Sequence, residues 1–131
     1  MEGRLIMKVL VLNNGTFEKK EIDNTLEALQ TEVGGYIEIP FLFENFYNNG
    51  IDIIINEEGK FIDGLNIEIA VVHQGKIVDI VFGNIVFASH DEEGNTIGLT
   101  EEQIDFVMQA LYCQMIIGNE KRMELVRVLY I

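Results

Sequence analysis

The chain has 131 residues, of which 48% are hydrophobic and 24% charged, a size and composition typical of one globular domain. Its formal net charge of −13 argues against direct binding to DNA, RNA or an anionic membrane, because such binding needs clustered lysine and arginine. No apolar run approaches the roughly 20 residues that cross a membrane, and the single cysteine, Cys113, allows no intramolecular disulfide. We therefore expect one cytoplasmic domain over residues 1–131.

The N-terminal third predicts a strand and then a helix. Arg4 to Asn13 is rich in β-forming residues and is closed by the turn signal Asn13-Asn14-Gly15. Asn24 and Glu27 have the spacing of a capping box, in which two side chains bond the backbone at a helix start. Gly34-Gly35 is a stop signal. The apolar stripe of this predicted helix comprises Ile22, Leu26, Leu29 and Val33.

The middle of the chain predicts short strands separated by turns. Phe41 to Gly50 is either an aromatic-rich loop or a short helical turn. His73-Gln74-Gly75-Lys76 has the length of a hairpin turn, and Asp91 to Asn95 is a charged turn. The predicted strands are Tyr36 to Pro40, Ile51 to Asn56, Ile67 to Val72, Ile77 to Phe82, and Asn84 to Ala88.

The C-terminal third predicts a second helix and a final strand. Thr100 and Gln103 form a capping box, and the apolar face that follows extends to Met115, before the stop signal Gly118. Met123 to Ile131 is too apolar for a frayed chain end and needs cover from the same domain or from another copy. A strand is the favoured interpretation, with a helix from residue 119 as the alternative. The predicted fold is α+β, with a small, mostly antiparallel sheet, two main helices and an extended C-terminal helix-plus-strand.

No catalytic or metal-binding constellation is evident in the sequence. His73 and His90 lie on predicted turns without a partner at metal-ligand spacing. Asp91 beside His90 points to the opposite side of a strand, and with Glu93 and Asn95 it gives only part of a calcium loop. We therefore expect a protein that acts by binding, with no enzymatic activity, cofactor or metal.

The scarce positive charges suggest a candidate anion site. Lys121, Arg122 and Arg127 lie close together, where they either offset neighbouring glutamates on an oligomer surface or grip phosphate oxygens. Phe82 is either a core residue or a platform on which a base stacks. The acidic balance itself is either an ordinary solvated surface or an imitation of nucleic-acid phosphates that occupies a nucleic-acid-binding partner.

Several segments resemble a known domain family. Glu21 to Glu38, Asn56 to Lys60, Ile77 to Asn84, and Asp91 to Asn95 with Leu99 to Gln103 resemble the domain-of-unknown-function family 3846. The resemblance covers about residues 7–106, so residues 107–131 are an extension, which we expect to take part in oligomerisation. Members of this family look typical of phages and plasmids of Firmicutes.

The chain with its extension is also similar to the first type of phage anti-Thoeris proteins. This resemblance implies a sponge that binds a cyclic ADP-ribose-type immune signal and holds it without cleavage, as a homo-oligomer. For such a ligand, Phe82 suits the adenine, and Arg122 or Arg127 suits the pyrophosphate. Asn84 and Asn95 suit the base or the ribose hydroxyls. The alternative function is an acidic nucleic-acid mimic that inhibits a host defence nuclease.

Overall fold

The computed structural model describes residues 5–40, 44–117 and 123–131, and for 112–117 and 123–125 it describes the backbone only. The strands of the first sheet are β1 (Ile6–Asn13), β2 (Thr16–Asp23), β3 (Ile37–Glu38), β4 (Ile51–Asn56), β7 (Ile85–His90) and β8 (Thr96–Ile97). Those of the second are β5 (Ile67–His73), β6 (Lys76–Phe82), β9 (Tyr112–Ile117) and β10 (Met123–Tyr130). The helices are α1 (Leu26–Val33), α2 (Glu44–Asn48), α3 (Glu101–Ala110) and the 3₁₀ turn η1 (Gly59–Phe61).

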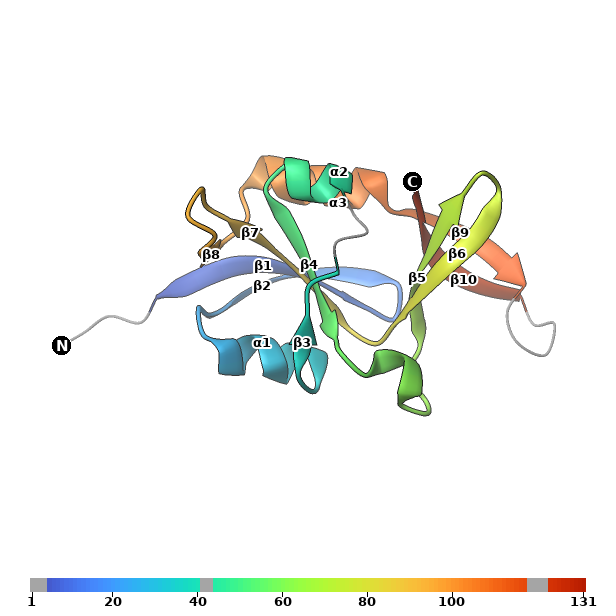
Figure 1. The fold of residues 1–131 in the computed structure, drawn as a ribbon, viewed down its shortest axis with the longest axis horizontal. Helices are drawn as coiled ribbons and strands as arrows, with labels where there is room; N and C mark the ends of the chain where they lie inside the picture. Colours follow the sequence, from blue (N-terminus) through green and yellow to red (C-terminus); the bar gives the residue numbers. More distant parts are fainter. Residues whose placement is uncertain (1–4, 41–43, 118–122) are drawn as a thin grey trace.

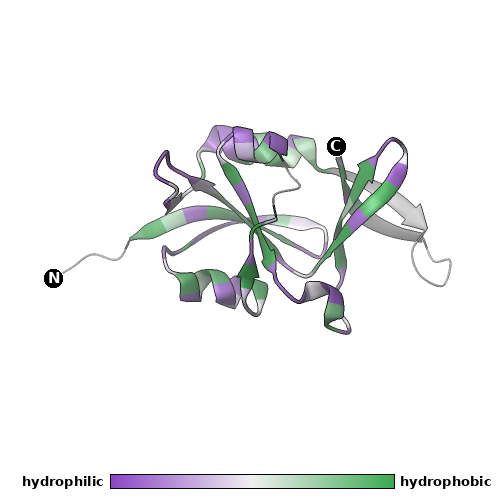
Figure 2. Ribbon diagram, in the orientation of Figure 1, coloured by the Kyte–Doolittle hydropathy of each residue, from purple (hydrophilic) through white to green (hydrophobic). Residues whose placement is uncertain are grey.

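The first sheet has the order β2-β1-β7-β4-β3, with β8 beside β7, and it is covered on both faces (Figure 1). Successive side chains of a strand point to opposite faces, so the apolar run of β1 supplies two cores. Leu10 and Leu12 pack with α2 and α3, whereas Val9 and Val11 pack with α1. Figure 2 shows hydrophobic central strands and a hydrophilic turn before β8. In the described ranges, no helix is long and apolar enough to cross a membrane.

The second sheet has the order β6-β5-β10-β9 and packs beside the first. Ile69, Val71 and Val81 share a core with residues of β1, β4 and β7. The predicted C-terminal strand is confirmed as β10, which runs parallel to β5 and antiparallel to β9. Val128 is fully buried and Leu129 nearly so. The chain therefore supplies its own cover for this part of the strand, and a homo-oligomer stays a prediction that the strand does not require.

The predicted first helix is wrong at its start. Residues 16–23 form β2, the outer strand of a hairpin, and Ile22 belongs to that strand. The tight turn uses positive φ angles at Asn14 (53°) and Gly15 (76°), which asparagine and glycine tolerate. The helix begins at Leu26, and its N-cap is Thr25 rather than Asn24, because the Thr25 hydroxyl accepts the N–H of Ala28 at 3.1 Å.

The predicted second helix is right at its start and wrong at its end. The capping box of Thr100 and Gln103 is present. The helix ends at Ala110, and Leu111 is already extended, because the following segment pairs with β10 as strand β9. The C-terminal extension is therefore a β-hairpin joined to α3, not a helix-plus-strand. The α+β class, α2 and the hairpin of β5 and β6 agree with the prediction, although the sheets dominate.

Candidate functional site

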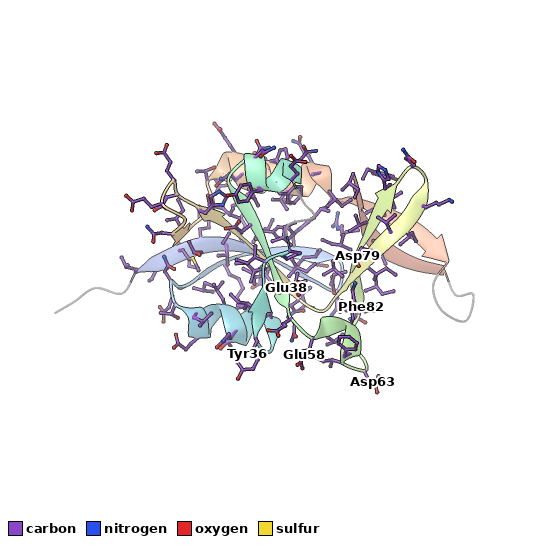
Figure 3. The ribbon with its side chains drawn as sticks, viewed as in Figure 1. Tyr36, Glu38, Glu58, Asp63, Asp79 and Phe82 are labelled. Atoms are coloured by element: carbon purple, nitrogen blue, oxygen red, sulfur yellow. The ribbon has the colours of Figure 1, made fainter. Side chains whose placement is uncertain are left out.

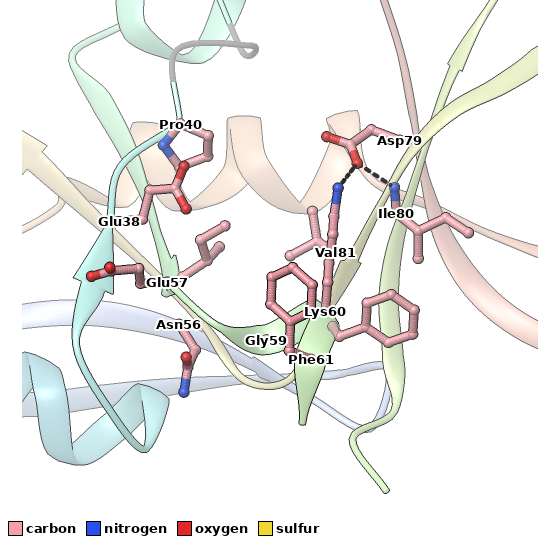
Figure 4. Close-up of a pocket in the computed structure, with 12 residues that line it drawn as sticks. Glu38, Pro40, Asn56, Glu57, Gly59, Lys60, Phe61, Asp79, Ile80 and Val81 are labelled. Carbon is pink, nitrogen blue, oxygen red and sulfur yellow. Dashed lines mark hydrogen bonds and ion pairs between the residues drawn. The ribbon is translucent and has the colours of Figure 1, made fainter. Parts of the chain in front are cut away.

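A cleft opens between the free edges of the two sheets. β3 is the last strand of the first sheet and β6 the last strand of the second, and the cleft between them has a volume of about 170 Å³ (Figure 4). Figure 3 shows Tyr36 and Glu38 on the side of the first sheet and Asp79 and Phe82 on the side of the second. The residues lining the cleft are Glu38, Pro40, Ile55, Asn56, Glu57, Gly59, Lys60, Phe61, Asp79, Ile80, Val81 and Phe82.

Local packing fixes the wall that η1 contributes to this cleft. Asn56, which is 5% exposed, donates from Nδ2 to the carbonyl of Val33 at 3.1 Å. Its Oδ1 accepts the N–H of Glu58 at 2.8 Å. A Cβ on Gly59 would lie 2.9 Å from the carbonyl oxygen of Phe82, so only glycine allows η1 to approach the end of β6 this closely. These contacts tie η1 to both α1 and β6.

The charged groups of the cleft are unequal in number. Its lining has three carboxylates, Glu38, Glu57 and Asp79, but one ammonium group, that of Lys60. Lys60 Nζ lies 2.5 Å from Asp79 Oδ1, which also accepts the N–H of Ile80 at 2.8 Å. Asp79 thereby caps a backbone donor of the strand at the sheet edge. The cleft as a whole attracts cations and repels anions.

An exposed aromatic residue stands at the rim of the cleft. The side chain of Phe61 is 86% exposed, the highest exposure among the large hydrophobic residues in the described ranges. Phe82, the predicted base-stacking residue, also lines the cleft and is half-buried. Aromatic faces carry partial negative charge and attract cations. Aromatic and acidic groups in this cleft thus favour the same kind of ligand.

Asn84, Asn95 and Arg127 are not among the residues that line this cleft. Asn84 follows β6 and donates from Nδ2 to the carbonyl of Glu32 at 3.4 Å. Asn95 lies in the turn before β8, where its N–H and its Nδ2 donate to the Asp91 carboxylate at 2.8 and 3.1 Å. Arg122 lies outside the described residues.

Arg127 is engaged by the protein backbone. Its Nε and Nη2 donate to the carbonyl of Gly15 at 3.1 and 2.9 Å, and Nη1 donates to the carbonyl of Leu111 at 3.2 Å. The guanidinium carbon lies 4.7 Å from the centre of the Phe17 ring, in cation–π geometry. The predicted phosphate-binding fork therefore holds the β1–β2 turn against β10 in this structure.

Glu68 holds the same turn and was missed by the sequence analysis. It is 1% exposed, and its two carboxylate oxygens accept the N–H groups of Asn14 at 2.8 Å and Gly15 at 2.9 Å. Its one signal in the sequence is a glutamate inside an otherwise apolar strand segment, which is uncommon because a buried charge must be fully bonded. We call Glu68, Arg127 and the turn residues Asn14 and Gly15 the hairpin clamp.

A histidine–carboxylate pair lies near α2. His90 Nδ1 is 3.1 Å from Asp52 Oδ1, and the ring of Tyr47 stacks on the imidazole with centroids 4.7 Å apart. The pairing of β4 with β7 therefore places Asp52 beside His90. The adjacent Ser89 donates its hydroxyl to the carbonyl of Gly50, so it is not positioned as a nucleophile for this imidazole.

The acidic turn before β8 is bonded internally. The Asp91 carboxylate accepts N–H groups of Asn95 and Glu93, and these bonds, that of Asn95 first, hold the pKa of Asp91 below its ordinary value of 3.8. Within the described ranges, no group of three or more histidine, cysteine, aspartate or glutamate residues could hold a metal ion.

The comparisons with known proteins identify a family and no function. A family model described as "Domain of unknown function (DUF3846)" matches residues 7–112. The match covers the first sheet from the second residue of β1 onward, together with β5, β6 and the cleft, and it stops at the first residue of β9. No curated protein and no solved structure matches the chain.

Proposed function

We propose that this chain, which belongs to the DUF3846 family, acts by binding, and that its partner is a basic protein surface of the kind that contacts nucleic acid. The observation that carries this proposal is the cleft, whose lining combines three carboxylates and two aromatic side chains with a single lysine. An inhibitor that occupies the basic surface of a host defence nuclease belongs to this class.

The charge outside the cleft supports the same class of partner. Lys8 and Lys19 both bond Glu101, and Lys20 bonds Glu32, so these lysines are already paired with carboxylates. The net charge of −13 attracts a basic protein over long range and speeds its association. The cleft then supplies the short-range contacts. The shape of the cleft and the positions of its charged groups make these contacts selective.

The test measures binding of a fluorescein-labelled nona-arginine peptide by fluorescence anisotropy. The variant Glu38→Gln/Glu57→Gln/Asp79→Asn removes the three carboxylates of the cleft. We expect it to weaken binding by about tenfold, because each lost contact with a partly exposed charge is worth up to about 1 kcal/mol.

The control variant, Glu27→Gln/Glu92→Gln/Glu102→Gln, removes three exposed carboxylates outside the cleft and has the same net charge. Its affinity should fall by no more than about twofold, which is the screened long-range contribution. Equal losses in the two variants, or no binding by the unmodified chain, would refute the proposal.

A second candidate function is sequestration of a cyclic ADP-ribose-type signal. Its support is that Phe82 lines the cleft, where a base could stack and the carboxylates could bond ribose hydroxyls. Against it, the volume of about 170 Å³ is below the roughly 300 Å³ at which pockets for whole small ligands begin. The phosphates would also face the three carboxylates.

Incubation with the cyclic nucleotide, heat release and mass spectrometry test this second candidate. Recovery of intact ligand together with a rise in Tm would support it, and the absence of both would exclude it. The same candidate predicts a homo-oligomer, so the native mass should exceed that of one chain.

A further inference from the structure

We infer that Asp79 is a binding subsite for one cationic side chain, and that Lys60 occupies this subsite until a lysine or arginine of the partner replaces it. This inference rests on the proposed function and adds a mechanism to it. Lys60 would be an internal placeholder, and the partner would compete with it for the same carboxylate.

The two members of the pair differ in how firmly they are held. Asp79 lies on a strand of the second sheet, its side chain is 24% exposed, and Oδ1 is fixed by the N–H of Ile80. Lys60 lies on the three-residue turn η1 and its side chain is 58% exposed. A fixed acceptor with a flexible, solvated donor is suited to exchange, because the donor can leave into water at little cost.

An arginine from a partner would gain contacts that Lys60 lacks. A guanidinium group presents a planar fork that bonds a carboxylate through two N–H groups, whereas an ammonium group acts as a point charge. It also stacks on aromatic rings, and Phe61 and Phe82 line the cleft. Glu38 and Glu57 on the facing wall add attraction. We therefore expect arginine to be preferred over lysine.

The size and charge of the cleft favour this occupant over others. A volume of about 170 Å³ suits the head of one side chain rather than a whole nucleotide. A second copy of this chain would bring another net charge of −13 to an acidic surface, and its approach would be repelled. A basic partner has the complementary charge.

The variant Lys60→Met tests the placeholder with the labelled nona-arginine peptide as the probe. Methionine keeps most of the aliphatic length but vacates Asp79, so binding should tighten by roughly threefold to fivefold, the worth of one exposed ion pair. Lys76→Met is the matched control, because it removes the same charge from an exposed position at the far end of β6. It should tighten binding by less than about twofold.

A double variant shows whether the effect acts through Asp79. Asp79→Asn should weaken binding while its Oδ1 still accepts the N–H of Ile80. In Lys60→Met/Asp79→Asn the gain from Lys60→Met should vanish. Labelled nona-lysine should bind the unmodified chain more weakly than nona-arginine.

The outcomes separate this inference from the proposed function. If the unmodified chain binds the peptide, and Lys60→Met and Lys76→Met change this binding equally, the placeholder is overturned and the proposed function stands. Weaker binding in Lys60→Met would overturn it as well. No binding of either peptide by any form of the chain would overturn both proposals. Thermal melts of each variant establish that a loss of binding is not a loss of folding.

Discussion

The hairpin clamp and the acidic cleft both lie where the two sheets meet, and they use charge in opposite ways. In the clamp, Glu68 and Arg127 bond backbone groups of the Asn14-Gly15 turn, and Glu68 is 1% exposed. In the cleft, Lys60 and Asp79 bond each other, and the lysine side chain is 58% exposed. In the clamp, the carboxylate is almost completely shielded from solvent. In the cleft, both ions remain accessible to solvent and to a binding partner.

This difference indicates which charges are structural and which can serve a partner. A buried ion is stable only when its bonding positions are filled, so removal of Glu68 would leave backbone N–H groups unsatisfied. An exposed pair is exchangeable, because water replaces either member at a small cost. The clamp should therefore control the stability of the fold and the cleft should control binding.

The largest expected effect is the loss of the buried carboxylate in Glu68→Gln. The amide has nearly the same shape, but its NH₂ group would face one of the N–H groups of the turn, which would then lack an acceptor. The free energy of unfolding should fall by about 2–4 kcal/mol. Urea denaturation followed by circular dichroism measures it. Glu58→Gln, at an exposed glutamate, should change it by less than about 0.5 kcal/mol.

Arg127→Lys should have the next largest effect on stability. Lysine keeps the charge but cannot reach the carbonyls of Gly15 and Leu111 together, and it loses the planar contact with Phe17. We expect a loss of about 1–2 kcal/mol in the free energy of unfolding, with nona-arginine binding unchanged. Loss of cyclic nucleotide binding in a variant that remains folded would instead support a ligand role for Arg127.

The elements that could be predicted from sequence are those with local signals. The capping box of Thr100 and Gln103 marks the start of α3, and the Gln74-Gly75 turn marks the β5–β6 hairpin. β2 could not be predicted because residues 16–23 are rich in charged side chains, which an outer strand of a sheet tolerates. The Asn14-Gly15 turn signal fits the end of a strand as well as the turn of a hairpin. β9 was missed because its apolar residues continue the helical pattern of α3.

Among the residues that line the cleft, Phe82 was predicted from the sequence as a site residue and the others were not. The cleft unites β3, η1 and β6, whose closest approach depends on sheet order rather than on spacing in the chain. Lys60 and Asp79 are 19 positions apart and carry no shared motif. Arg127 is one of few cations in the sequence and was predicted to bind phosphate, whereas its bonds to backbone carbonyls follow from the β1–β2 hairpin, which was not predicted.

Lys60→Met distinguishes the cleft from the hairpin clamp most sharply, because it should change the free energy of unfolding only slightly. The lysine of its ion pair with Asp79 is 58% exposed, so solvent screening reduces the worth of the pair to less than about 1 kcal/mol. The same substitution should tighten peptide binding. A loss of stability as large as that of Arg127→Lys would show that the cleft pair is structural, and it would remove the distinction between the two regions.

The smallest expected effect concerns the exposed bridge of Glu101 with Lys8 and Lys19, at 2.8 and 3.1 Å. The bond from Lys8, followed by that from Lys19, holds the pKa of Glu101 below its ordinary value of 4.5. A carboxylate whose pKa is lower in the folded state stabilises the fold at pH values above its unfolded-state pKa. This contribution is lost as the pH falls through its folded-state pKa. The same bond raises the pKa of Lys8 above 10.5, so on that side the contribution is lost at still higher pH.

The bridge should therefore contribute fully between about pH 4.5 and pH 10.5, and its contribution should be lost progressively as the pH falls through the lowered pKa of Glu101 or rises through the raised pKa of Lys8. Urea denaturation of Glu101→Gln should show a small loss of stability at pH 7 and none well below pH 4. Carboxyl chemical shifts give the pKa itself, with Glu102, which shares the first turn of α3, as the control for the helix dipole. If Glu101 titrates with Glu102, the lysines add nothing beyond the dipole.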